Sequence, residues 1–444
     1  MKMANAAPIK TQAEIDFEKD TAFQADVLPI IEKAISAEYP REYVADEEGN
    51  INIDVDMDAF NEDASYYFDS TNHDKNIVIF VVDNENDKIK RIKKILKDEL
   101  GEDVKVKFKK AKHNVKEFTK KQNQIAALLA SWNIPSQVNY NQVTEIIDIT
   151  AGVNEDQIKE LQDQFGASNL NITVEDVPML SPHLAQDFAY NNLGGGIRIY
   201  DSLGYASTSG FIAVKNNQAY MVTAGHVTVP RSGETTPYFM RQGNSGSSSQ
   251  IGEKHWSGYN PTNHYDLGVI RLTNTSQYVN SRFYTKNNGG AIDGQLKPTV
   301  LSSDIAIGIN INKSGATSGI TGGKVTAVNT PIYYDTDKDG SITDESAFYT
   351  IGVTATVGLG YSDTVHTTKD LMSGEGDSGG TVYRASDYAL VGVISGGASV
   401  YTDSDGIKYS KTSYVEQAWE MQTYLGAITP YMYTYDTKLS ELQG

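Results

Sequence analysis

The sequence predicts a chain of two halves: an α+β half that ends near residue 192, and an all-β half from residue 193 to about residue 430. Before residue 178 the pattern strand, helix, strand occurs twice. From Ile197 onward, short β-type runs alternate with Gly, Asn, Ser and Thr turns almost to the end of the chain. Evenly spaced short strands of this kind are typical of a barrel or a sandwich. A length of 444 residues allows two or three domains.

The composition argues against several classes of function. A net charge of −19 argues against general affinity for nucleic acid. The longest apolar run, residues 77–82, is far shorter than the roughly 20 residues that a membrane-crossing helix needs. We therefore expect neither a nucleic-acid partner nor a membrane partner. The chain contains no cysteine, which excludes disulfides and thiol-bound metals.

The first residues look like the end of a secretory signal peptide. Ala4-Asn5-Ala6 is followed by Ala7-Pro8, the kind of small-residue pattern at which such a peptide is cut. We therefore expect a secreted, extracellular protein in which residues 1–13 are an N-terminal stub. An ordinary disordered N-terminus is the alternative interpretation.

The α+β half is predicted to hold two strand-helix-strand units joined by a helix. Hydrophobic residues recur at helical spacing in the helices, and the strands are continuous or alternating apolar runs. A further helix, over roughly residues 15–37, precedes both units. The expected elements are a strand at 77–82, a helix at 89–100 and a strand at 104–108, then a connecting helix at 116–132, a strand at 145–149, a helix that starts near 154–156, and a strand at 170–174.

Charge is segregated within this half. Residues 14–87 contain 21 acidic and 4 basic residues, whereas residues 88–121 contain 14 basic and 5 acidic residues. The basic residues follow one helical and one strand pattern, with only Phe108 and Phe118 as aromatic residues among them. We interpret them as a solvated or internally paired face rather than a nucleic-acid surface.

In the all-β half, residues 211–214 and 219–222 are predicted to form a hairpin around a turn at 215–218. The end of this half is the exception to the β pattern. Val415, Ala418, Trp419 and Leu425 would lie on one apolar stripe of a C-terminal helix that packs on the barrel.

The strongest chemical signal is the glycine-rich segment 374–380, which contains Ser378. Glycines on both sides allow a tight exposed loop, in which the N–H groups of Gly376 and Ser378 could bind a developing oxyanion. A plain glycine-rich turn is the alternative. Because serine alone is a poor nucleophile, this hypothesis requires a base and an orienting acid elsewhere in the chain.

His226 and Asp266 are the candidates for those two roles. His226 ends a hydrophobic strand after small residues, so its ring can turn into a cleft. Asp266 precedes the apolar run 267–272 and is therefore placed for partial burial beside the imidazole, where it would hold the correct tautomer. Such a triad requires no cofactor for catalysis.

The motifs TAGH at 223–226, YDLGVIRL at 265–272 and GEGDSGG at 374–380 carry His, Asp and Ser in this order. Together they resemble the chymotrypsin-like serine peptidases, particularly the bacterial streptogrisin and α-lytic branch. The resemblance covers residues 193 to about 430. Further similar stretches lie at 193–200, 313–319, 323–329 and 391–397.

This resemblance implies a double β-barrel with the triad in the cleft between the barrels. It also implies an N-terminal pro-region that assists folding and then blocks the cleft, and residues 14–192 are similar to such pro-regions in pattern. We therefore expect a zymogen whose partners are peptide substrates and its own pro-region. The cut is expected near Asn192-Leu193, in a flexible and accessible linker at 191–196, and residues 431–444 are expected to be a C-terminal tail.

The resemblance also assigns substrate-binding residues. Ser395, Gly396 and Gly397 resemble the strand that pairs with the substrate backbone, and Met372 and Ser373 would lie at the pocket floor. No acidic residue is expected at that floor, so we predict cleavage after apolar or medium-sized residues. The alternatives are a glutamate-specific peptidase, although such relatives tend to have a histidine where this chain has Ile394, and a catalytically silent homologue that acts as a binding protein.

Two positions depart from the family pattern, because Val227 and Met372 stand where relatives commonly have cysteine. A calcium ion is one candidate for the missing staple. Alternating carboxylates followed by a glycine resemble an EF-hand loop, although no glutamate stands at position 346 to close the shell, and a plain acidic turn is the alternative. The candidate ligands are Asp335, Asp337, Asp339, Ser341, Asp344 and Glu345.

Overall fold

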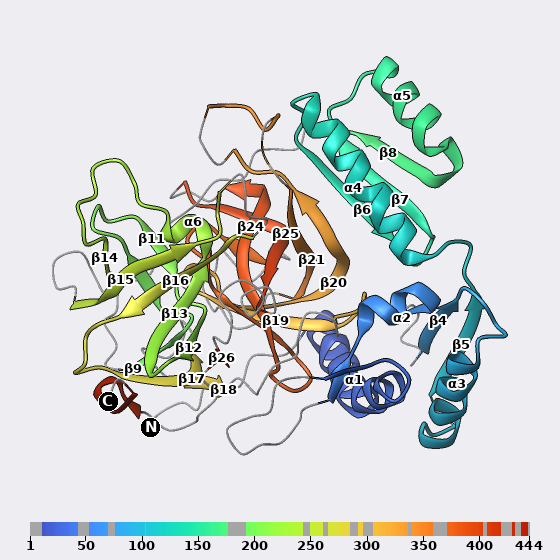
Figure 1. The fold of residues 1–444 in the computed structure, drawn as a ribbon, viewed down its shortest axis with the longest axis horizontal. Coiled ribbons are helices and arrows are strands. Elements are labelled where there is room, and N and C mark those ends of the chain that lie inside the picture. The colour runs from blue at the N-terminus through green and yellow to red at the C-terminus, as the bar shows by residue number, and fades with distance from the viewer. Residues whose placement is uncertain are drawn as a thin grey trace, which may run out of the picture.

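The protein is described from a computed structural model, and Figure 1 shows its fold. The α+β units and the β-barrels occupy separate regions of the molecule, as the sequence predicts. The described residues are 11–42, 53–69, 76–102, 104–175, 192–242, 249–260, 265–284, 292–295, 305–335, 339–343, 345, 347–357, 371–402, 406–418, 429–430 and 437–442.

The first α+β unit contains a three-stranded sheet in which β4 lies between an antiparallel β3 and a parallel β5. Helix α3 makes the crossover between the two parallel strands. Its Asn86 cap accepts hydrogen bonds from the first turn, and its buried face follows the predicted helical spacing. The elements are α1 (Gln12–Ser36), β1 (Pro40–Glu42), β2 (Ile53–Val55), α2 (Met57–Asp63), β3 (Ala64–Asp69), β4 (Asn76–Val81), α3 (Asp87–Glu99) and β5 (Lys105–Lys110).

The second unit repeats this topology. Strand β7 lies between an antiparallel β6 and a parallel β8, and the crossover helix α5 begins at a capping box formed by Asn154 and Gln157. The predicted helices and strands of both units are confirmed. The elements are α4 (Val115–Ser131), β6 (Ser136–Asn141), β7 (Ile146–Ala151), α5 (Glu155–Phe165) and β8 (Leu170–Val174).

The all-β half consists of two strand systems. The first, called the first barrel below, combines an eight-stranded sheet in the order β11-β10-β14-β15-β16-β13-β12-β26 with a smaller sheet of β9, β17, β18 and β27, and the two share one core. Its strands are β9 (Asn192–Gly195), β10 (Arg198–Tyr200), β11 (Ala206–Thr208), β12 (Phe211–Lys215), β13 (Gln218–Ala224), β14 (Phe239–Gln242), β15 (Ser249–Ser257), β16 (Leu267–Leu272), β17 (Tyr278–Tyr284), β18 (Ile292–Gln295), β26 (Thr429–Pro430) and β27 (Thr437–Lys438).

The second strand system closes into a barrel, because β21 pairs both with β20 and with β25. Closure leaves few free sheet edges, and its inward-facing residues fill the core. The strands are β19 (Asn310–Gly315), β20 (Gly319–Ile332), β21 (Phe348–Val357), β22 (Ser373–Gly374), β23 (Thr381–Arg384), β24 (Leu390–Thr402) and β25 (Lys408–Gln417).

Three sequence expectations about element boundaries need correction. The expected flexible linker is a strand from Asn192 onward, since β9 pairs with β17 and Leu193 is buried in the first barrel. The expected C-terminal helix is wrong for Val415, which belongs to β25, while Trp419 and Leu425 lie outside the described residues. The expected tail contains α8 (Leu439–Leu442), whose Leu439 is buried in the first barrel core.

The α+β half packs against the second barrel. One hydrophobic core cluster runs from α1 through β3 and β4 into β19, β20 and β21. On α1, the Gln24 side chain donates to the carbonyl of Gly308 (2.8 Å) and accepts from the N–H of Asn310 (2.8 Å). Asp20 and Glu32 on the same helix pair with Lys324 and Arg384 of the barrel. Helix α1 is thus fixed to the barrel by both apolar and polar contacts.

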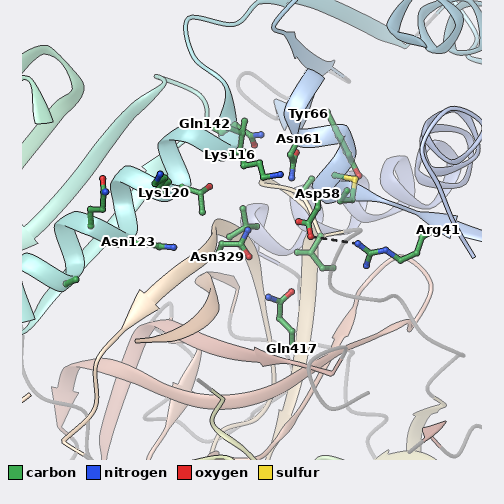
Figure 2. Close-up of a pocket in the computed structure, with 18 residues that line it drawn as sticks. Arg41, Asp58, Asn61, Tyr66, Lys116, Lys120, Asn123, Gln142, Asn329 and Gln417 are labelled. Carbon is green, nitrogen blue, oxygen red and sulfur yellow. Dashed lines mark ion pairs between the residues drawn. The ribbon is translucent and has the colours of Figure 1, made fainter. Parts of the chain in front are cut away.

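A cavity of about 580 Å³ lies in the contact region between the two halves. Figure 2 shows polar side chains that surround it, from α2, α4, β20 and β25. Asn329 and Gln417 are contributed by the second barrel, and Lys116 and Lys120 by the α+β half. The two halves therefore meet over a partly polar surface as well as over the shared core.

Candidate active site

His226 and Asp266 are brought together by the pairing of β13 with β16. This pairing places Ala224 opposite Leu267. Helix α6 (Gly225–Thr228), which carries His226, therefore begins beside Asp266, the residue that precedes β16. The His226 Nδ1 atom lies 2.8 Å from Asp266 Oδ2 and 3.1 Å from Oδ1. The His226 backbone N–H also donates to Asp266 Oδ1 at 2.8 Å. The imidazole is thus held at Nδ1, and Nε2 is left for chemistry.

Asp266 is completely buried, and its carboxylate is further fixed by Ser395. The Ser395 hydroxyl donates to Asp266 Oδ2 at 2.6 Å. Since that proton is used, the Tyr334 hydroxyl is the donor in its 2.6 Å contact with Ser395 Oγ. Burial raises the pKa of Tyr334, and the nearby Asp266 carboxylate raises it further, so the phenol stays a donor. These two links fix the position of the Asp266 carboxylate.

A second acid lies behind this pair. The Asp266 backbone N–H donates to Glu416 Oε2 at 3.1 Å, and the Glu416 side chain is completely buried. Sequence analysis missed Glu416 and Tyr334. The signal for Glu416 was a single acid within the apolar end of the strand 408–417, whereas Tyr334 is brought close only by the fold.

Ser378 lies in the loop between β22 and β23, and this loop is fastened to the first barrel. The Thr208 N–H donates to the Ser378 carbonyl at 2.8 Å. The Ser378 hydroxyl donates to the Ser395 carbonyl at 3.4 Å, and Ser378 and His226 line the same small cavity. Gly379 has φ +86°, and a Cβ there would lie 1.9 Å from Thr223 Oγ1, so no other residue fits. The structure therefore brings the three candidate catalytic residues to one place.

Some backbone N–H groups of the Ser378 loop donate to protein atoms, and two do not. Among the described residues, neither the Gly376 N–H nor the Ser378 N–H donates to another protein atom. Both groups belong to the loop that presents the Ser378 hydroxyl, so they are available to a ligand at that point. The neighbouring amides are all occupied: Gly374 donates to Asp377 Oδ2, Glu375 to Lys408, Asp377 to Gly374, Gly379 to Ile394 and Gly380 to Asp377.

Asp377 and Lys313 form a buried ion pair under this loop, with Lys313 Nζ 2.7 Å from Asp377 Oδ2. Both side chains are completely buried. Burial alone would raise the pKa of the Asp377 carboxyl, but Lys313, Ser318 and the Gly374 N–H outweigh it and hold this pKa below its usual range. Lys313 lies in a stretch that the sequence analysis singled out, although its role was not foreseen.

The structure places the expected pocket residues in different surroundings. The Met372 side chain is completely buried in the core of the second barrel, with Sδ 3.9 Å from Thr321 Oγ1, so it fills the core. The neighbouring Ser373 hydroxyl lies 2.6 Å from that of Ser413. On β24, Gly396 and Gly397 pair with Tyr414 and Ser413 of β25. The pairing of β24 with β23 ends at Val393, before these glycines.

The described part of the acidic loop forms a tight turn. Asp335 Oδ2 accepts from the Gly340 N–H at 3.1 Å, and Asp339 Oδ1 accepts from the Ser341 N–H at 2.7 Å. Glu345 is buried. Asp337 and Asp344 lie outside the described residues. Within the described part of the chain, no three acidic or histidine side chains converge on one metal position.

Comparison with known proteins finds relatives among bacterial serine proteases. No family model matches the chain. Serine protease 1 of Streptomyces fradiae is 32% identical over 142 residues, which are 32% of this chain and 34% of that protein. Glutamyl endopeptidase 2 of Streptomyces griseus is 26% identical over 52% of this chain and 100% of its own length. Streptogrisin-D of the same organism is 28% identical over 46% of this chain and 41% of its own length.

The C-terminal half of the chain is similar in sequence to these bacterial serine proteases. The chain thus spans about a third of the length of one relative and the whole of another. A solved glutamic acid specific serine protease, described as using a histidine triad in substrate binding, covers 54% of this chain at 23% identity and a TM-score of 0.36. Thermobifida fusca Protease A covers the same share at 20% identity and a TM-score of 0.35.

Among the helices that the structure describes, none is both long enough and apolar enough to cross a membrane.

Proposed function

We propose that the protein is a secreted serine endopeptidase that is made as a zymogen. The observation that carries this proposal is the pair of unoccupied amides, Gly376 N–H and Ser378 N–H, next to a serine that shares a cavity with the His226–Asp266 pair. Preformed donors beside a nucleophile are what acyl transfer requires. A catalytically silent homologue would not need preformed hydrogen-bond donors beside this serine. The proposal of secretion rests on the Ala-Asn-Ala pattern at residues 4–6.

In the proposed mechanism Ser378 Oγ attacks the carbonyl carbon of the scissile peptide bond, and His226 Nε2 takes its proton. The oxygen that becomes negative accepts from the Gly376 and Ser378 amides. His226 then gives the proton to the leaving amine, which departs and leaves an acyl-enzyme. Water hydrolyses this ester with the same proton transfers. Asp266 keeps Nδ1 protonated and stabilises the imidazolium throughout.

The substrate would bind by strand addition to β24. From Ser395 to Gly397 this strand has β25 on one side, and its pairing with β23 has already ended. A substrate backbone can pair along the free edge, and the two glycines leave room for the side chain that enters the pocket. In the bound state, the Ser395 carbonyl would exchange the weak bond from Ser378 Oγ for a substrate N–H.

We propose cleavage after apolar or medium-sized residues. Ile394 precedes the substrate strand, and the carboxylate of Glu375, close to Ser373 on the same segment, would repel an acidic substrate side chain. Glutamate specificity is the second candidate. It is favoured by the full-length match to Glutamyl endopeptidase 2 and by the Ser373–Ser413 hydroxyl pair, which could hydrogen-bond a carboxylate.

The zymogen proposal rests on how the α+β half packs. Helix α1 and the second barrel share one core, and the Gln122 side chain of α4 donates to the Asn329 carbonyl of β20 at 3.0 Å. A segment fixed in this way can template the folding of the barrel and remain bound after a cut. Because Leu193 is buried within β9, a cut close to Asn192 needs local opening of this strand, or falls upstream of it.

A structural calcium ion in the loop 335–345 remains part of this proposal. Carboxylate and carbonyl oxygens are the ligands that calcium prefers, and Asp335, Asp339 and Glu345 carry carboxylates on the described part of the loop. The ion would act as a staple where a cysteine-free chain has no disulfide. It would take no part in the peptide-bond chemistry.

The test is cleavage of a mixed peptide library by the processed protein and by Ser378→Ala. We expect wild-type cuts after apolar or medium-sized residues and none by the variant. Cuts found only after glutamate would support glutamate specificity instead of cleavage after apolar or medium-sized residues. Equal cleavage by wild type and variant would overturn the serine-peptidase proposal.

A further inference from the structure

A small cavity beside the proposed catalytic groups has no role so far in the proposed acyl-transfer mechanism. Its volume is about 10 Å³, and His226, Ser378 and Ser207 are among the residues that line it. A cavity of this size accommodates about one water molecule. It therefore offers a defined position for one small molecule next to the nucleophile and the base.

Ser207 is the feature that distinguishes this cavity. Its side chain is only 4% exposed, and among the described residues its hydroxyl has no hydrogen-bond partner. A buried hydroxyl without a partner is unfavourable, and native structures usually satisfy it with protein or water. Ser207 is also held in place, because the next residue, Thr208, donates its N–H to the Ser378 carbonyl at 2.8 Å.

Arg231 and Asp201, two other polar side chains that line the cavity, are bonded to each other. Arg231 Nε donates to Asp201 Oδ2 at 3.0 Å, and its guanidinium stacks on the Tyr205 ring at 4.3 Å. Asp201 also accepts from the N–H groups of Leu203 and Tyr205. Val227 and Met240 close the lining with apolar surface. The Ser207 hydroxyl is thus a buried lining group with spare hydrogen-bonding capacity in the cavity that His226 and Ser378 also line.

We propose that this cavity holds the water that hydrolyses the acyl-enzyme, and that Ser207 is the residue that positions this water. The inference rests on the proposed acyl-transfer function. His226 Nδ1 is occupied by Asp266, so Nε2 is the nitrogen that can accept a proton from a water in the cavity. The second hydrogen of the same water is then donated to Ser207 Oγ, which fixes the direction of the oxygen lone pair.

The step balances in atoms and charge. The water oxygen forms a bond to the acyl carbon, and one water proton passes to His226 Nε2. The tetrahedral intermediate then breaks its bond to Ser378 Oγ, which takes that proton back from His226. The products are a carboxylic acid, which ionises in solvent, and free Ser378. Neither an oxidant nor any other co-reactant is needed.

Methanol separates the positioning role from a general structural role. Water has two O–H hydrogens and can donate to His226 and Ser207 together, whereas methanol has one and donates it to His226 alone. Loss of the Ser207 hydroxyl should therefore slow hydrolysis of the acyl-enzyme without slowing its methanolysis. A merely structural defect would slow both reactions alike.

The experiment uses the protein expressed as the full chain and isolated in its active form, with p-nitrophenyl acetate as the substrate. The burst phase reports acylation, and the steady state reports deacylation. For Ser207→Ala we expect an unchanged burst rate, a deacylation rate lower by about tenfold, and a ratio of methyl acetate to acetate in aqueous methanol higher by about the same factor. The matched control is Ser386→Ala, since Ser386 also has a buried hydroxyl without a partner but does not line the cavity.

An unchanged deacylation rate in Ser207→Ala would overturn the inference, as would an equal loss in the burst and the steady state. If this variant does not fold, Ser207→Cys fills the same space with a weaker acceptor and must show the same selective loss. Absence of any burst in the wild type is a different result. It would contradict the proposed peptidase function itself.

Discussion

The Lys313 ammonium lies 2.7 Å from the Asp377 carboxylate, and both side chains are completely buried directly beneath the residue that carries the proposed nucleophile. Asp377 also accepts from the backbone N–H groups of Thr317 and Gly374, at 2.8 Å and 2.9 Å. These bonds connect β19, the turn after it and the Ser378 loop. The ion pair thus fixes the loop conformation in which the Gly376 and Ser378 amides are left free.

Replacing Lys313 with methionine should destabilise the protein strongly at neutral pH. The change leaves the Asp377 charge buried without its cation, which costs about 3–5 kcal/mol in the free energy of unfolding. The measurement is urea unfolding of the full chain at several pH values. The matched control is Lys324→Met, because the Lys324–Asp20 pair is partly exposed and should matter much less.

The loss should depend on pH in a defined direction. Because the folded-state pKa of Asp377 is held below its usual range, its contribution in the wild type is fully present above about pH 3.9 and is lost as pH falls through the folded pKa. In Lys313→Met the buried acid is instead relieved by protonation. The difference between the two proteins should shrink on acidification, and a constant or growing difference would contradict the assigned pair.

Removing the Ser395 hydroxyl should impair turnover more than stability. Ser395→Ala takes away the 2.6 Å bond to Asp266, so the acid is held less firmly against His226. We expect kcat to fall about tenfold, with the thermal midpoint changed little. Tyr334→Phe, which removes only the next link in the chain of hydrogen bonds, should have a smaller effect. A larger effect of Tyr334→Phe would argue against this order of contacts.

The α+β half should act on the barrels as a folding template and inhibitor. Residues 193–444 expressed alone should show little activity, and residues 7–192 added in trans should restore some of it and inhibit at excess. Gln24→Ala should weaken that inhibition, because Gln24 bonds both Gly308 and Asn310 of the second barrel. Gln12→Ala is the control on the same helix, since Gln12 is exposed and its side chain bonds Asp16 of the same helix rather than the barrel residues that the structure describes. Full activity of residues 193–444 alone would show that the α+β half is dispensable for folding.

Calcium at the acidic loop should stabilise the folded protein. Millimolar calcium should raise the thermal midpoint of the wild type, because an ion that binds only the folded state stabilises it by mass action. Asp337→Ala should abolish the increase. An unchanged wild-type midpoint would exclude a structural site there.

Sequence patterns predicted those elements that hydrophobic spacing and turn residues determine locally. The six elements predicted for the two strand-helix-strand units, β4, α3, β5, β7, α5 and β8, lie close to their expected positions, as do β12 and β13 around the turn at Asn216 and Asn217. The glycine-rich loop and the strand ends indicated Ser378, His226 and Asp266 for the same reason. Each of them stands next to a strong local signal.

The contacts that sequence did not predict are between segments far apart in the chain. Glu416 lies on β25 and Asp266 precedes β16, so the two residues meet only where the two barrels contact each other. Lys313 and Asp377 are 64 positions apart in the sequence. Met372 was expected in the pocket, but its direction depends on the register of β22 against β25. The flexible linker was expected from composition, although the same Leu193 and glycines pair with β17 once the barrel has formed.

The central claim is that Ser378 is an activated nucleophile. It is tested most directly by reacting the processed protein with a fluorophosphonate and locating the label by mass spectrometry. The account predicts one label, on Ser378, that is absent in Ser378→Ala and slowed by several powers of ten in His226→Ala. Labelling of another residue, or no labelling of correctly folded and processed wild-type protein, would contradict it.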